Sequence, residues 1–244
     1  MIVLITGASG GIGKATVARF TEAGHEVHGL DIADRSGSGT ETHAGGSGTE
    51  THAAGSGTET HAAGSGSGTY THHLADVTDP ATFPKDLRPE ILINCAGVQD
   101  SGRDIQVNLQ GAINVTEEYA IGNPAIKAVV NVGSASAHTG SEFPEYAASK
   151  GGLATYTKNV AMRLAPQATC NSIDPGGVRT ELNRHVMDDP ELWEQIMELT
   201  PMKRWAEPEE IADWIYFVAV ENRFMTGQNL LIDGGEAGNS KFVW

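Results

Sequence analysis

The 244-residue chain has little of what a disulfide-stapled, membrane-spanning or nucleic-acid-binding protein needs. Its two cysteines, Cys95 and Cys170, cannot make a disulfide framework, and each lies in an apolar stretch typical of small buried thiols. The apolar run at residues 1–5 is too short to span a bilayer, and no secretory signal is visible. Only 16 Lys and Arg oppose 31 Asp and Glu, and the net charge of −15 repels phosphate backbones and anionic membranes. We therefore expect a cytoplasmic protein that binds neither nucleic acid nor membranes.

What is present is an alternation of short β-branched runs with helical patterns, over a length that suits one domain. The pattern predicts strands at residues 2–6, 25–31, 91–94, 128–132, 169–173 and 230–232. It predicts helices at residues 14–23, 105–121, 146–164 and 209–220. This order indicates βαβ units, and hence a parallel sheet within a single α/β domain over residues 1–244.

One segment, residues 36–69, breaks the alternation, because it consists almost entirely of Gly, Ser, Thr, Ala, Glu and His. A nine-residue repeat places His43, His52 and His61 in register, each two residues after a glutamate. The high Gly and Ser content and the lack of apolar residues favour a flexible surface insertion between the second and third strands. Metal binding by the repeated Glu and His, and a partner-binding role, remain alternatives.

A glycine loop, Thr6-Gly7-Ala8-Ser9-Gly10-Gly11-Ile12-Gly13, joins the first predicted strand to the first predicted helix. Glycines let the turn close tightly and let backbone N–H groups approach a pyrophosphate, while the helix N-terminus adds partial positive charge. A glycine-rich turn without a ligand is the plainer alternative. We predict that the dinucleotide contacts in this loop are Gly7, Ser9, Gly10, Gly11, Ile12 and Gly13.

Asp31 ends the second predicted strand, 18 residues after Gly13. A carboxylate in this position accepts hydrogen bonds from the ribose hydroxyls of adenosine and repels a 2′-phosphate. The residue therefore predicts NAD rather than NADP as the cofactor, although nearby Arg35 weakens the argument. An ordinary turn aspartate at the end of a strand is the structural alternative.

Tyr146 and Lys150 stand four residues apart, so one face of the predicted helix presents both side chains. A phenol with a pKa near ~10 is a poor base at neutral pH, but a nearby ammonium and an oxidised nicotinamide favour the phenolate. Tyr146 would then exchange the proton of an alcohol, and Lys150 would also bind the nicotinamide ribose. Ser134, which directly follows the strand at 128–132, would hold the substrate oxygen. Ser136 is a rival for that role, and an exposed helix pair is the plain alternative for Tyr146 and Lys150.

In order and spacing, these residues resemble the short-chain dehydrogenase/reductase family over nearly the whole chain apart from the repeat tract. The matching motifs are Thr6-Gly7-x-x-x-Gly11-x-Gly13, Asn94-Cys95-Ala96-Gly97, Asn108, Ser134, Tyr146-x-x-x-Lys150 and Pro175-Gly176-Gly177-Val178-Arg179-Thr180. The resemblance implies a Rossmann-type doubly wound parallel sheet, frequent dimers or tetramers, and a catalytic tetrad of Asn108, Ser134, Tyr146 and Lys150, with Asn108 anchoring a proton-relay water. It also implies cofactor contacts at Asp76, Val77, Asn94, Ala96, Gly97, Tyr146, Lys150, Pro175, Gly176, Val178 and Thr180.

Two residues depart from the family pattern: Cys95 stands where the family often has Asn, and Asp174 precedes the Pro-Gly pair where a small apolar residue is more usual. The compact layout most resembles the branch that contains bacterial 3α-hydroxysteroid dehydrogenase. We expect a lid over the substrate at residues 181–205, and we interpret His138 as a loop residue.

The expected function is an NAD-dependent oxidoreductase that interconverts a secondary alcohol and a ketone, in particular an alicyclic or steroid-like one. The expected partner is this small-molecule substrate, and the expected assembly is a homodimer or homotetramer. Two alternatives stay open: an NADPH-dependent 3-oxoacyl thioester reductase, and a dinucleotide-binding sensor without turnover.

Overall fold

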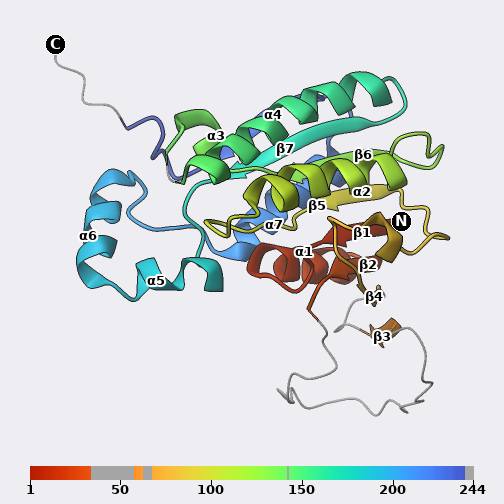
Figure 1. Cartoon of the computed structure of the whole chain (residues 1–244), viewed down its shortest axis with the longest axis horizontal. Helices are drawn as coiled ribbons and strands as arrows, with labels where there is room; N and C mark the ends of the chain where they lie inside the picture. Colours follow the sequence, from red (N-terminus) through yellow and green to blue (C-terminus); the bar gives the residue numbers. More distant parts are fainter. Residues whose placement is uncertain (34–57, 63–67, 142, 240–244) are drawn as a thin grey trace.

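A twisted eight-stranded sheet with helices on both faces forms the body of the molecule (Figure 1). The computed structural model describes residues 1–33, 58–62, 68–141 and 143–239. The strand order is β3-β4-β2-β1-β5-β6-β7-β8, and all neighbours are parallel except β3 and β4. The strands are β1 Ile2–Thr6, β2 Glu26–Asp31, β3 Thr58–Ala62, β4 Thr69–Leu74, β5 Ile91–Asn94, β6 Ala128–Val132, β7 Thr169–Pro175 and β8 Asn229–Ile232. This is the predicted Rossmann-like α/β architecture in a single domain.

Two hydrophobic cores lie on opposite faces of the sheet. On one face, α1 (Gly11–Glu22) and α7 (Pro208–Tyr216) bury Phe20, Ile211 and Ile215 against the strands. On the other face, α2 (Ala112–Tyr119) and α4 (Pro144–Leu164) bury Val115 and Val160. Because both faces are covered, β1, β5 and β6 are almost continuously apolar, as is typical of parallel strands.

The predicted strands β1, β5 and β6 are confirmed residue for residue, and β2, β7 and β8 differ by one or two residues at an end. The helices differ more. The segment predicted as one helix at 105–121 opens as a π-helix, η3 (Ile105–Gly111), and continues as α2. Likewise, α7 is followed by a π-helical turn, η5 (Phe217–Glu221). A periodicity of apolar residues cannot distinguish an i→i+5 turn from an α-helical one over so few residues.

The repeat tract, interpreted from its composition as a flexible surface insertion, contributes one strand to the sheet. Residues Thr58–Ala62 form β3, which pairs antiparallel with β4 at the edge of the sheet. An edge strand needs backbone pairing on one side only, so a polar tract can supply it. Thr69, the last residue of the tract as defined from the sequence, is the first residue of β4. Its histidines at 43 and 52 lie outside the described residues.

Short elements complete the chain. They are the 3₁₀ turns η2 (Pro80–Thr82) and η4 (Glu181–Asn183) and the helices α3 (Ser136–Thr139), α5 (Arg184–Met187) and α6 (Pro190–Leu199). In Figure 1, α5 and α6 stand apart from the sheet at one end of the molecule. Among the described residues, no helix is both long and apolar enough to cross a membrane.

The order of the central strands decides where a ligand can bind. The chain leaves β1 toward β2 on one side of the sheet, while β5 pairs with β1 on the other side. At such a switch point the connections above neighbouring strands diverge and leave a crevice at their carboxyl ends. The glycine loop follows β1 and the Asn94–Gly97 segment follows β5, so the fold brings both motifs to this crevice.

Two histidines pair across β2 and β4, the two strands between β1 and the edge strand β3. His28 Nδ1 and His73 Nε2 lie 2.9 Å apart, and the two rings stack with their centroids 5.2 Å apart. Burial and the neighbouring His28 and His72 lower the pKa of His73 to about 4. In the unfolded chain the pKa of this histidine returns to about 6.5. Protonation below that value therefore favours unfolding.

This pair predicts a loss of stability on mild acidification. Above pH 6.5 His73 is neutral in both the folded and the unfolded chain, so the free energy of unfolding is at its full value. As the pH falls from 6.5 toward 4, only the unfolded chain binds the proton, and the free energy of unfolding decreases. Because His73 is only half buried, we expect a loss of about 1 kcal/mol between pH 7 and pH 5. Urea unfolding at the two pH values should show a smaller loss for His73→Gln than for the wild type. The control is His185→Gln, since His185 lies exposed on α5, and equal losses in wild type and His73→Gln would contradict the assignment.

Candidate active site

The glycine loop packs directly against the segment that follows β5. Gly7 has a φ of +66°, and a Cβ there would lie 2.7 Å from the Ala96 Cα. A Cβ on Gly13 would lie 2.0 Å from the Gly7 carbonyl oxygen. Only glycine allows both approaches, so the loop closes and α1 begins directly beneath it. The first turn of α1 contains no acidic residue that would oppose an anion at its N-terminus.

Asp31 closes the far side of this loop. Its carboxylate accepts hydrogen bonds from the backbone N–H of Ser9 at 2.9 Å and of Ala33 at 2.9 Å. These two bonds fix the carboxylate beside the glycine loop while leaving lone pairs for further donors. The Ser9 hydroxyl is buried and has no hydrogen-bond partner among the described residues. A hydroxyl of this kind suits a ligand that accepts hydrogen bonds, such as a phosphate.

The loop after β7 reaches the glycine loop from the opposite side. A Cβ on Gly11 would lie 2.5 Å from Thr180 Cγ2, so the predicted loop and the predicted threonine lie in contact. Gly176, near the start of this loop, has room for no side chain because a Cβ would lie 2.8 Å from Asp233 Cβ. Pro175 ends β7, and Val178 is buried. The structure thus places the loop after β7, the last of the predicted cofactor motifs along the chain, in contact with the glycine loop, which is the first.

Asp76 and Val77 follow β4 at the same edge of the sheet. The Thr78 N–H bonds the Asp76 carboxylate at 2.8 Å, and this bond lowers the pKa of Asp76. Val77 is buried against Gly111, where a Cβ would lie 2.6 Å from Val77 Cγ2. Both residues therefore follow the strand beyond β2, at the carboxyl edge of the sheet. This is the side on which the adenosine end of a dinucleotide is predicted to lie.

Lys150 is buried, with 5% of its surface exposed, although it carries an ammonium group. Its Nζ donates a hydrogen bond of 2.9 Å to the carbonyl oxygen of Val132, the last residue of β6. The same Nζ lies 5.6 Å from the centre of the Tyr146 ring, one turn earlier on α4. The predicted helical pair therefore meets at the carboxyl edge of the sheet, and the interpretation of an exposed helix pair is wrong for Lys150.

Asn108 lies inside the π-helical turn η3 and is 1% exposed. Its side chain accepts from the Val98 N–H at 2.8 Å and donates to the Val98 carbonyl oxygen at 2.9 Å. It also donates to the Ser149 hydroxyl at 3.0 Å, and Ser149 donates to the Tyr146 carbonyl at 2.7 Å. A Cβ on Gly97 would lie 3.3 Å from Asn108 Oδ1 and 3.6 Å from Lys150 Nζ. A side chain at 97 would therefore crowd Asn108 and touch Lys150.

Ser134 lies two residues after β6 and is 6% exposed. The hydroxyl of Ser136, the predicted rival, donates a hydrogen bond of 2.9 Å to Ser134 Oγ. The backbone N–H of Ser136 lies 3.2 Å from the same oxygen. Ser136 thus contacts the Ser134 hydroxyl through two groups and supports it. That Ser134 is the acting hydroxyl stays a prediction.

The side chain of Asn94, the last residue of β5, faces inward instead of toward the crevice. The Asn94 amide donates to Thr116 Oγ1 at 2.9 Å and to Asn131 Oδ1 at 2.8 Å, while its own Oδ1 lacks a partner among the described residues. The predicted contacts at Ala96 and Gly97 follow in the chain. The Ala96 N–H bonds Thr6 Oγ1 at 3.0 Å, which ties this segment to the end of β1.

Sequence patterns did not identify a hydrogen-bonded side-chain pair beside the serine. His138 belongs to the short helix α3, not to a loop, and its Nε2 lies 2.6 Å from Oδ2 of Asp174 on β7. The sequence held one signal of this pair, because Asp174 stands where the family usually has a small apolar residue. A comparison of motifs shows that Asp174 is unusual but not that His138 is its partner.

The predicted lid contains η4, α5 and α6, and none of the residues of α6 is buried. Inside the segment, the Trp193 and Trp205 rings meet edge to face at 5.0 Å. Trp205 in turn lies against Gly177, which follows β7, because a Cβ there would lie 1.9 Å from Trp205 Nε1. The Arg179 guanidinium lies 5.8 Å from the Trp193 ring and 3.1 Å from Glu207 Oε1. Whether this segment moves stays a prediction.

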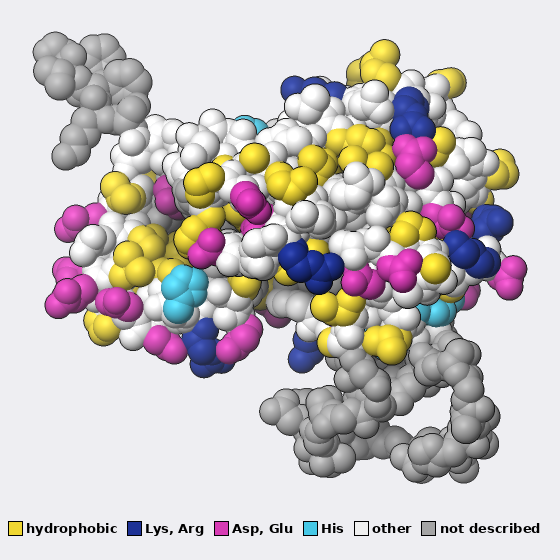
Figure 2. All heavy atoms as spheres, viewed as in Figure 1, with side chains coloured by type: hydrophobic (Ala, Val, Ile, Leu, Met, Phe, Trp, Pro, Cys, Tyr) yellow, Lys and Arg dark blue, Asp and Glu magenta, His cyan; other side chains and the backbone are white. Residues whose placement is uncertain are grey.

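Acidic side chains gather over α5 and α6, at the left of Figure 2. The exposed acidic residues of this segment are Glu181, Asp188, Asp189, Glu191, Glu194 and Glu198. Their field disfavours the approach of large anions at this end of the molecule. An anionic dinucleotide must therefore be held by backbone N–H groups and a helix N-terminus, which the glycine loop provides.

The comparisons with known proteins agree with this geometry. A family model described as Enoyl-(Acyl carrier protein) reductase matches residues 88–236, and one described as the NAD dependent epimerase/dehydratase family matches residues 3–159. The chain is 30% identical to the 3-oxoacyl-(acyl-carrier-protein) reductase of Thermotoga maritima, over 96% of this chain and 96% of that protein.

Two solved structures have closely similar folds. One is 4-hydroxyisoleucine dehydrogenase complexed with NADH, with a TM-score of 0.79, 26% identity, and coverage of 98% of this chain and 99% of that one. The other is a candidate 2-deoxy-D-gluconate 3-dehydrogenase from Agrobacterium tumefaciens with bound NADP, with a TM-score of 0.78, 25% identity, and coverage of 98% and 96%. The sequence motifs, the sheet order and these relatives together show that the chain belongs to the short-chain dehydrogenase/reductase family, whose fold holds a nicotinamide dinucleotide.

Proposed function

We propose that this protein is an NAD-dependent oxidoreductase that interconverts a secondary alcohol and a ketone. The observation that carries the proposal is the buried Lys150 ammonium one helical turn from Tyr146, at the edge of the sheet where the glycine loop ends. The nicotinamide, when bound, supplies the acceptor or donor of hydride. Gly7, Gly13 and the buried Ser9 hydroxyl fit the pyrophosphate of such a cofactor.

The chain's own residues would move the proton. Tyr146 would take the alcohol proton in oxidation and return it in reduction, because the adjacent Lys150 ammonium favours its phenolate. Ser134, oriented by Ser136, would donate a hydrogen bond to the substrate oxygen. Asn108 would hold the backbone of Val98 and, with Gly97 in front of it, leave space for a water that exchanges protons with Lys150.

The preference for NAD rests on Asp31. Its carboxylate, fixed by the N–H groups of Ser9 and Ala33, stands where the ribose of adenosine would follow the glycine loop. Ribose hydroxyls would be accepted there, and a 2′-phosphate would be repelled.

For the substrate, we propose a neutral alicyclic or steroid-like alcohol. The acidic segment over α5 and α6 disfavours anionic substrates and acidic carrier proteins. A 3-oxoacyl thioester reductase remains the second candidate, because the Thermotoga maritima relative carries that name. A panel of neutral secondary alcohols and acyl thioesters, followed at the absorbance of reduced nicotinamide, separates the two. Cofactor binding without turnover on any member would favour the dinucleotide sensor.

Replacement of the phenol is the most direct test of the mechanism. Tyr146→Phe should lower kcat by about 10²-fold or more, because the proton-exchanging oxygen is lost, while NADH binding measured by fluorescence persists. Tyr156→Phe is the matched control, since Tyr156 lies on the same helix with its hydroxyl on Glu117, away from the crevice. Wild-type turnover in Tyr146→Phe would reject the proposed chemistry.

The two serines should differ in a graded way. Ser134→Ala should reduce kcat by about 10²-fold, because the donor to the substrate oxygen is removed. Ser136→Ala should cost less, because it removes only the bond that orients Ser134. Steady-state kinetics on both variants decide the order. A severe loss in Ser136→Ala with an active Ser134→Ala would exchange their roles.

Cofactor preference tests Asp31. Asp31→Asn keeps an acceptor oxygen but removes the charge, so the ratio of kcat/KM for NAD over NADP should fall by about 10-fold or more, corresponding to about 1.4 kcal/mol. Asp86→Asn, at an exposed position outside the crevice, should leave the ratio unchanged. An unchanged ratio in Asp31→Asn would remove the basis for preferring NAD.

A further inference from the structure

A fully buried carboxylate lies directly beneath the loop that carries Ser134. Asp174 occupies the end of β7, and its side chain is 1% exposed. One oxygen, Oδ2, accepts a hydrogen bond from His138 Nε2 at 2.6 Å, while Oδ1 has no partner among the described residues. Burial of a carboxylate costs free energy that one partner only partly offsets. A small apolar side chain would avoid this cost, so the position of the carboxylate requires an explanation.

The neighbouring residue is shaped to admit this carboxylate. A Cβ on Gly133 would lie 2.0 Å from Asp174 Oδ1 and 2.8 Å from its Cγ. Any other residue at 133 would therefore displace Asp174. The Asp174 side chain therefore fits only because residue 133 is a glycine. Gly133 immediately precedes Ser134.

Three consecutive residues of β7 hold the serine loop. The Gly133 N–H bonds the Ile173 carbonyl at 2.8 Å, and the Ala135 N–H bonds the Pro175 carbonyl at 2.7 Å. Between them, Asp174 bonds His138 on α3. We call these three contacts the β7 clamp. The residues on both sides of Ser134 are thus anchored by backbone bonds, and the first turn after it is anchored by a hydrogen bond between two side chains.

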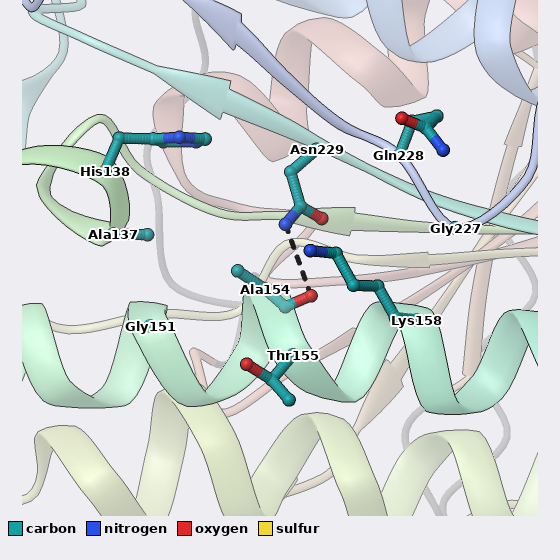
Figure 3. Close-up of a pocket in the computed structure, with 9 residues that line it drawn as sticks. All are labelled: Ala137, His138, Gly151, Ala154, Thr155, Lys158, Gly227, Gln228 and Asn229. Atoms are coloured by element: carbon teal, nitrogen blue, oxygen red, sulfur yellow. Dashed lines mark hydrogen bonds between the residues drawn. The ribbon is translucent and has the colours of Figure 1, made fainter.

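The outer end of the clamp meets solvent. His138 is 32% exposed at its side chain, and in Figure 3 its ring stands at one end of a hollow of about 390 Å³ between α3, α4 and the start of β8. Lys158 and Asn229 line the same hollow. Water reaches this edge, but the Asp174 side of the contact is buried. Its length of 2.6 Å is typical of a strong hydrogen bond.

We propose that His138 and Asp174 are positioning residues that fix α3 and thereby hold the Ser134 hydroxyl in place for catalysis. The inference rests on the proposed function for its kinetic part only. Ser134 reaches its orientation through Ser136, the first residue of α3, and α3 has four residues. Release of the side-chain bond between α3 and β7 would let both serines drift, and small displacements of a positioned group lower kcat more than KM.

The decisive variant removes both partners. His138→Ala alone leaves the Asp174 carboxylate buried and unpaired and can fail to fold. The double variant Asp174→Ala/His138→Ala leaves no buried charge, so its melting temperature should stay within a few degrees of the wild type. We expect amide hydrogen exchange in residues 133–140 to quicken about 10-fold or more, and kcat to fall by about 10-fold to 10²-fold with KM changed less than about 3-fold.

Two further variants sharpen the test. His138→Gln retains a side-chain N–H that can reach Asp174 and should recover slow exchange and most of kcat. Lys158→Ala, in the same hollow but outside the clamp, should match the wild type in both measurements. Wild-type exchange and wild-type kcat in the double variant would overturn the proposal. If the wild type shows no turnover on any alcohol, the proposed function fails, and the exchange measurement still decides whether the clamp holds the loop.

Discussion

The active-site geometry depends on one buried charge. The Lys150 ammonium can be buried only where hydrogen-bond acceptors face it, and the carbonyl of Val132 at the end of β6 is such an acceptor. This contact fixes both the rotation and the height of α4 against the sheet. Tyr146, one turn earlier on the same helix face, is then directed to the crevice above the strand ends. The lysine therefore has a structural role in placing the tyrosine as well as its proposed role in chemistry.

A second set of contacts brings the cofactor motifs to the same edge. Parallel strands all present their carboxyl ends on one side, so the loops after β1, β2, β4, β5, β6 and β7 converge although they are spread over about 170 residues of sequence. The glycines set how closely those loops approach one another: Gly7 touches Ala96, and Gly11 touches Thr180. Each is a position where a side chain would push two cofactor-lining segments apart.

Buried polar side chains connect the same elements through the core. Asn94 on β5 bonds Thr116 on α2 and Asn131 on β6, and Asn131 Nδ2 donates to Thr157 on α4 at 2.8 Å. Because these groups lose water on folding, each pairing favours one register of the helices on the sheet over its neighbours. Their side chains hold α2 and α4 in the positions from which Asn108 and Lys150 reach the crevice.

The sequence by itself determined the central strands and the glycine loop, because short apolar runs and glycine spacing are local patterns, and through its family resemblance it predicted the tetrad. It could not determine the π-helical turn at Asn108, the pairing of Thr58–Ala62 with β4, or the support of Ser134 by Ser136. Least of all could it pair His138 with Asp174, 36 residues away. Such contacts arise when strands align and helices dock, since the free energy of a buried polar group depends on partners that only the assembled fold supplies.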